Sequence, residues 1–111
     1  MEQDNFAKLL KTYCDTEGRV LKQHSLLRVK VVDMTVKEAV RRISAIIRVD
    51  DVLGADENNR VLILLPNTAR KGVQIVKGKL KADGIETEEL RSISLTRRVT
   101  TVGNKSEERV I

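Results

Sequence analysis

Residues 48–67 read RVDDVLGADENNRVLILLPN, and this stretch decides the fold. Residues 51–53 and 60–65 flank the short polar loop 56–59, an arrangement that predicts a β-hairpin. The apolar run of the second arm contains only Val, Leu and Ile and does not alternate. A strand with this pattern is typically covered on both faces or central in its sheet.

Hydrophobic periodicity on either side of the hairpin predicts five further elements. Before the hairpin come an amphipathic helix over 3–16, with Gly18 placed to end it, a strand over 24–32, and a helix that begins with a Thr35–Glu38 capping box. After the hairpin come a helix from Asn67 or Thr68 to about Ala82, with Gly84 as its stop, and a final strand through Leu90, Ile93 and Leu95.

This order, a helix followed by β-α-β-β-α-β, predicts an α+β fold of the ferredoxin-like type. Two right-handed crossovers around a central hairpin give a four-stranded antiparallel sheet with both helices on one face, here preceded by an N-terminal helix. We therefore expect an N-terminal helix within 1–18, an α/β domain over 23–98 and a flexible tail over 99–111.

Length and composition limit the classes of function. With 111 residues the chain has room for one core. Cys14 is the only cysteine, which excludes an internal disulfide and a Cys-rich zinc site. No apolar run approaches the roughly 20 residues of a membrane span, and the N-terminus lacks a signal-peptide pattern, so we expect a cytoplasmic protein without membrane insertion.

The net positive charge is compatible with a polyanionic partner and also with an ordinary solvated surface. The chain has 21 basic and 16 acidic residues, a net charge of +5 and a pI near 9.6. These charges are interspersed, which is typical of a solvated surface. No aromatic residue follows Tyr13, whereas sheets of this kind that bind RNA use aromatic stacking platforms, so a nucleic-acid partner is disfavoured.

The hairpin carries a resemblance to a known family. Arg48 and Asp51 form an Arg-x-x-Asp element. A spacer of five residues, 52–56, separates it from the letters ENNRV at 57–61, and an apolar strand and Pro66 follow without a gap. This frame resembles a GGDEF (diguanylate cyclase) domain, with residues 57–61 at the place of the five GGDEF letters. The resemblance covers about residues 24–97 and implies a signalling fold related to cyclic di-GMP.

The chain departs from the family where the chemistry lies. Glu57 and Asn58 replace the two glycines that let a nucleotide approach the backbone. Asn59 and Arg60 replace the acidic residues that would hold divalent cations and assist phosphoryl transfer. The first strand reads Arg-Val-Lys at 28–30 where a metal-binding Asp is expected. We therefore expect no catalytic residue, no metal and no cofactor, and a non-catalytic regulatory or interaction domain.

Arg48 and Asp51 remain as candidate ligand-binding residues. In the family this element forms a site for cyclic di-GMP, since a guanidinium can bond bidentately to phosphate or guanine and a carboxylate can accept from guanine N–H groups. The alternative is structural, because an Arg at a helix C-terminus can simply pair with an Asp that starts the next strand. Cyclic di-GMP or another guanine nucleotide is thus one predicted partner.

A second hypothesis is a protein-interaction or dimerisation module without a small ligand. Phe6, Leu9, Leu10 and Tyr13 form one apolar face of the N-terminal helix, and this face must be buried somewhere. Helices that precede GGDEF domains often pair between chains, so the resemblance implies a homodimer through these residues. His24, the only histidine, is expected at a strand edge and gives little support to a metal site or a catalytic dyad.

Overall fold

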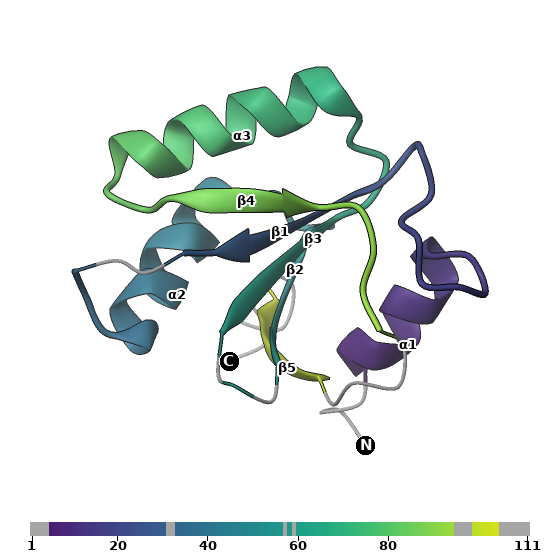
Figure 1. Ribbon diagram of the computed structural model, residues 1–111. Coiled ribbons are helices and arrows are strands. Elements are labelled where there is room, and N and C mark those ends of the chain that lie inside the picture. The colour runs from purple at the N-terminus through teal and green to yellow at the C-terminus, as the bar shows by residue number, and fades with distance from the viewer. Residues whose placement is uncertain (1–4, 31–32, 57, 59, 95–98, 105–111) are drawn as a thin grey trace.

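The structure is a computed structural model that describes the chain apart from residues 1–4, 31–32, 57, 59, 95–98 and 105–111. Its elements follow one another as shown in Figure 1. They are α1 (Asn5–Tyr13), β1 (Ser25–Val29), α2 (Val36–Ile46), β2 (Val52–Asp56), β3 (Val61–Leu65), α3 (Arg70–Ala82), β4 (Thr87–Leu90) and β5 (Val99–Asn104).

The strands form one antiparallel sheet in the order β4-β1-β3-β2-β5. The first four positions reproduce the ferredoxin-like arrangement, so the predicted fold class is confirmed. The predicted hairpin is also confirmed, because Leu53 stands opposite Ile63 in the β2–β3 pair.

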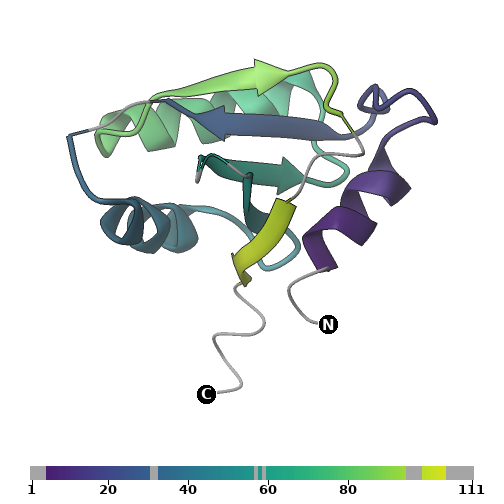
Figure 2. The ribbon, with the colours of Figure 1, turned by 60° about the horizontal axis from the view of Figure 1, so that its bottom comes forward.

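The sheet has a hydrophobic core on each face. One core lies between the sheet and the helices α2 and α3, and it includes Leu27, Ile43 and Leu80. The other lies under α1 on the opposite face (Figure 2). It includes Phe6 and Leu62. Every residue of β3 is buried, which confirms the strand predicted to be covered on both faces.

The N-terminal helix closes the second core within its own chain. Phe6 and Leu10 are 0% and 2% exposed, and Leu9 and Tyr13 are half-buried against the same core. A Cβ at Gly54 would lie 2.6 Å from the Phe6 ring, so β2 needs a glycine for α1 to pack this closely. Phe6 and Leu10 are therefore unavailable to a partner, and the apolar face that suggested a homodimer is accounted for inside the chain.

The helix boundaries follow the expected signals in two places and depart from them in two others. Thr35 caps α2, since its hydroxyl accepts from the backbone N–H of Glu38 at 3.1 Å. Gly84, at φ 84°, follows the end of α3 as predicted. The predicted cap of α3 is wrong: Ala69 precedes the helix without a side-chain cap, because the Thr68 hydroxyl bonds elsewhere. Gly18 also does not end α1, which stops at Tyr13.

The C-terminal predictions need a correction. The final strand of the ferredoxin-like set ends at Leu90, whereas Ile93 lies beyond it in the core under α1, and Leu95 falls outside the described residues. Residues 99–104, expected to belong to a loose tail, form β5 on the outer edge of β2. An open strand edge leaves N–H and C=O groups unpaired, and this added strand satisfies them.

Candidate functional site

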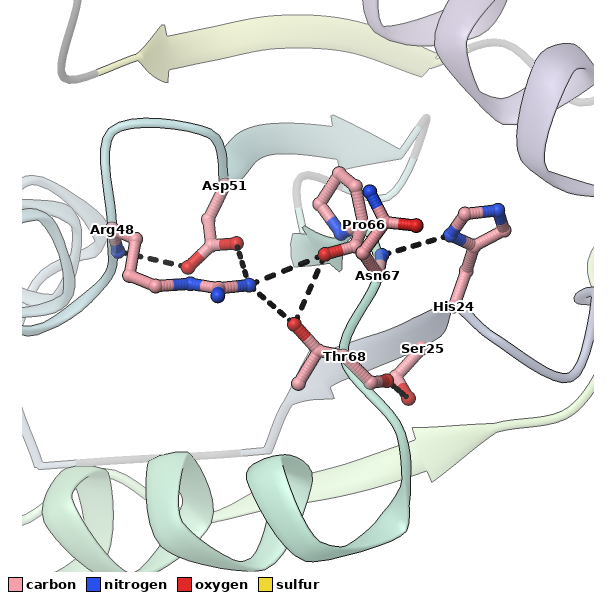
Figure 3. Close-up of polar contacts among 7 residues, drawn as sticks. All are labelled: His24, Ser25, Arg48, Asp51, Pro66, Asn67 and Thr68. Carbon is pink, nitrogen blue, oxygen red and sulfur yellow. Dashed lines mark hydrogen bonds and ion pairs between the residues drawn. The ribbon is translucent and has the colours of Figure 1, made fainter.

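The Arg-x-x-Asp element lies where three chain segments meet at one end of the sheet. Arg48 follows α2, Asp51 directly precedes β2, and Pro66 to Thr68 leave β3 toward α3. We call the residues drawn in Figure 3 the Arg48 cluster: His24, Ser25, Arg48, Asp51, Pro66, Asn67 and Thr68.

Arg48 and Asp51 bond to each other. One carboxylate oxygen of Asp51 accepts from the backbone N–H of Arg48 at 2.8 Å, and the other lies 3.5 Å from the guanidinium Nη2. Asp51 is 0% exposed. Burial raises its pKa above the ordinary value, and the hydrogen bonds and charge of Arg48 counter this only in part. The Asp51 carboxylate therefore has a structural role, with both oxygens directed at Arg48 and no surface exposed to solvent.

The guanidinium also ties the α2–β2 loop to the β3–α3 loop. Nη2 of Arg48 donates to the Pro66 carbonyl at 3.2 Å and to the Thr68 hydroxyl. That hydroxyl donates onward to the Pro66 carbonyl at 3.1 Å, so it acts as acceptor and donor at once. The Arg48 side chain is nevertheless 58% exposed, and its other terminal nitrogen makes no contact in Figure 3.

His24 and Ser25 complete the cluster from the start of β1. Ser25 donates to the Thr68 carbonyl at 2.6 Å, and Nδ1 of His24 accepts from the Asn67 N–H at 2.9 Å. An accepting Nδ1 requires the neutral imidazole with its proton on Nε2. Burial lowers the pKa of His24, which also favours the neutral imidazole. His24 is thus a buried acceptor placed immediately before β1.

These two contacts were missed by sequence reasoning, for a physical reason. Each joins residues 43 positions apart, and only the antiparallel register of β1 with β3, which sets Ser25 opposite Leu65, brings them together. The local sequence offers one indication of the loop shape, an asparagine at position 67, because Asn tolerates the left-handed region in which its φ of 53° lies. Asn67 therefore shapes the loop through its backbone, where a helix cap was expected.

A pocket opens at the opposite end of the sheet, beside the β2–β3 hairpin. Its volume is about 620 Å³. The lining comes from the end of β1 and from the starts of α2, β3 and β4. We call it the hairpin-end pocket; its residues are Arg28, Val29, Lys30, Met34, Val36, Ala39, Arg60, Val61, Glu86 and Glu88.

Ion pairs neutralise most of the charge around this pocket. Arg28 stands directly opposite Glu88 in the sheet and donates to it through Nε at 2.8 Å, which lowers the pKa of Glu88. Arg60 bonds Asp56 at 3.2 Å across the hairpin. Lys30 is exposed and, among the described residues, lies in no ion pair. Glu86 also lines the pocket and, like Lys30, lies in no ion pair with a described residue, so the pocket joins apolar side chains with one lysine and one glutamate outside the ion pairs.

Among the described residues, neither end of the sheet has a metal-binding cluster. Within the part of the chain that the structure describes, no group of three His, Cys, Asp or Glu side chains is close enough to hold a metal ion. Arg41 and Arg42, neighbours on α2, both bond Glu38. None of the described helices has the length and apolar character needed to span a membrane.

Comparison with known proteins adds no relative. No protein-family model, curated protein or solved structure matches the chain. The GGDEF resemblance therefore stays a prediction that rests on residues 48–68.

Proposed function

We propose that this chain is a non-catalytic, GGDEF-like regulatory domain of the cytoplasm that works by binding a partner. The observation that carries the proposal is the Arg48 cluster, which occupies the family's Arg-x-x-Asp position as a self-bonded structural unit. Its carboxylate has both oxygens turned to Arg48 and no exposed surface. A group in this state holds two loops together and does not await a substrate.

A receptor for cyclic di-GMP or another guanine nucleotide is the second candidate. The half-exposed guanidinium of Arg48 favours it, because its remaining N–H groups can still bond a phosphate or a guanine edge. In this arrangement Arg48 alone would meet the ligand, since Asp51 lies beneath it.

Calorimetric titration with cyclic di-GMP and with GTP separates these candidates. The receptor candidate predicts heat with the native chain and its loss in Arg48→Lys, which keeps the charge beside Asp51 but not the planar fork. Lys30→Gln is the matched control at the hairpin-end pocket. Heat that is lost only in Lys30→Gln would move the site to the pocket, and no heat at high micromolar nucleotide would leave the partner-binding domain alone.

The homodimer remains a separate prediction. Deleting residues 1–17 is an unsuitable test, because Phe6 and Leu10 belong to a core and their loss would unfold the chain. Sedimentation of the intact chain over a range of concentrations is the appropriate measurement. A monomer at every concentration would refute dimerisation.

A further inference from the structure

The positive charge of this protein is concentrated in one helix. Helix α3 has five basic residues and no acidic one: Arg70, Lys71, Lys77, Lys79 and Lys81. The whole chain has 21 basic and 16 acidic residues, so the chain outside α3 is balanced at 16 of each sign. The charge of α3 thus equals the net charge of +5, while the smaller excesses of either sign in the other segments cancel one another.

Among the described residues no lysine lies in an ion pair, inside α3 or outside it, whereas the arginines divide. Every described arginine outside this helix lies within 4.0 Å of a carboxylate: Arg19, Arg28, Arg41, Arg42, Arg48, Arg60 and Arg91. None of the five α3 cations forms an ion pair with a described residue. Four of the five are exposed and Lys77 is half-buried.

Helix stability does not explain this distribution. Lys79 and Lys81 in the last turn suit the negative end of the helix dipole, but Arg70 and Lys71 occupy the positive end, where cations are unfavourable. Lys77 and Lys81 are four residues apart, a spacing at which like charges repel along a helix. Arg70, Lys71 and the Lys77–Lys81 pair therefore lower the stability of the helix slightly, and a bound external anion would offset this cost.

We propose that the outer face of α3 binds the phosphate backbone of a nucleic-acid duplex. Arg70 to Lys81 spans about 16 Å along the helix axis at a rise of about 1.5 Å per residue. A duplex presents one negative charge per roughly 1.7 Å, so several phosphates fall within this length. Contacts of this kind are independent of base sequence.

The surroundings of α3 favour a duplex over other anionic partners. Proteins that bind single strands stack bases on exposed aromatic side chains, yet of the two aromatic residues of this chain Phe6 is fully buried and Tyr13 is half-buried against the core under α1. A helix that lies on a membrane needs an apolar face, and that of α3 is turned inward through Val73 and Leu80. The outer side has a single exposed large apolar residue, Ile75, which is too little for the apolar centre of a protein interface.

Gly78 leaves room for close approach. A Cβ at this position would meet nothing within 4 Å, so nothing in the described structure requires a glycine in the middle of this helix. The site deepens the proposed binding domain by naming its partner chemistry. It is independent of Arg48, so the nucleotide titration and the experiment below can fail separately.

The test is fluorescence anisotropy of the intact chain with a labelled 20-base-pair DNA duplex at increasing salt. If all five cations engage, the logarithm of the affinity falls with that of salt at a slope of about −4.5. Lys71→Gln/Lys81→Gln should reduce this slope by about 1.8 and weaken binding at low salt at least tenfold. The matched control, Lys8→Gln/Lys11→Gln, removes the same charge from the exposed side of α1 and should change binding less than twofold.

Each other outcome counts against the site. Equal weakening by both double variants would show attraction by net charge alone, and no binding of the native chain at low salt would refute the proposal directly. Vesicles of phosphatidylserine and phosphatidylcholine, and polyglutamate, are the competing probes. Binding to either as tight as to the duplex would assign α3 to a membrane or to an acidic protein, whereas a duplex RNA arm identifies which nucleic acid is preferred.

Discussion

The Arg48 cluster and the hairpin-end pocket lie at opposite ends of the same strands, and both contain Arg–carboxylate pairs. At the Arg48 end the carboxylate of Asp51 is fully buried and the guanidinium bonds two loops. At the hairpin end the Arg28–Glu88 pair spans adjacent strands at the solvent boundary. The two pairs differ in their carboxylates: that of Asp51 is fully buried and organises backbone, whereas that of Glu88 is 40% exposed and can exchange its contacts with water.

Among the variants that test this comparison, Asp51→Ala should lower the free energy of unfolding most. Asp51→Ala leaves the Arg48 N–H without its acceptor, and losing a buried partner of this type costs about 2–3 kcal/mol in free energy of unfolding. Urea unfolding measures it. Glu88→Ala is the control at the hairpin end and should cost much less, because water replaces its contacts. Equal losses at the two ends would contradict the distinction.

The Thr68 hydroxyl should rank second. Thr68→Val keeps the side-chain shape but removes the acceptor for Arg48 and the donor to Pro66, for a loss of about 1–2 kcal/mol. Thr12→Val is a suitable control, since the Thr12 hydroxyl bonds the Lys8 carbonyl on the exposed side of α1. A Thr68→Val protein as stable as the native chain would show that the two loops hold without this bridge.

His24 should make the Arg48 end sensitive to pH. Burial lowers its folded pKa below the ordinary 6.5. Stability from this residue is therefore complete above about pH 6.5 and is lost as the pH falls through the folded value, when the acceptor for Asn67 is protonated. Proton NMR titration follows it without ambiguity, as it is the only histidine. A pKa at or above 6.5 would refute the buried acceptor.

Glu38 provides the smallest effect, on the exposed start of α2. Hydrogen bonds from Arg41 and Arg42 lower its pKa to about 2. Its contribution to stability is present above the ordinary pKa of 4.5 and is lost as the pH falls through about 2. Native protein and Glu38→Gln should therefore differ near neutral pH and converge in acid. A difference that persists unchanged to pH 2 would exclude this pair as its source.

Sequence patterns recovered the layout because each element has a local signal. The unbroken apolar run of β3 predicted burial on both faces, and the Thr35–Glu38 spacing predicted the start of α2. The errors arose where local signals competed with distant partners. Thr68 has the chemistry of a helix cap, yet its hydroxyl is taken by Arg48. Residues 99–104 lack a distinct apolar period, but the free edge of β2 pairs with them.

The sequence predicted two residues of the candidate site but not the arrangement of the cluster around them. The Arg48-x-x-Asp51 spacing identified two members of the cluster, whereas His24, Ser25 and Thr68 are brought in by the register of β1 with β3. The apolar face of α1 was recognised correctly, but its partner was not. Gly54 gave no local indication that it receives the Phe6 ring.

Sequence alone determined the order of the elements from α1 to β4 and their ferredoxin-like layout. Each depends on residue type and short spacing, which act within a turn or a strand. Tertiary structure decided that Asp51 is buried with both carboxylate oxygens on Arg48, that α1 buries its apolar face within the chain and that the basic residues of α3 form no ion pair with a described residue. These properties depend on which distant side chains come within a few ångströms, and only packing sets those distances.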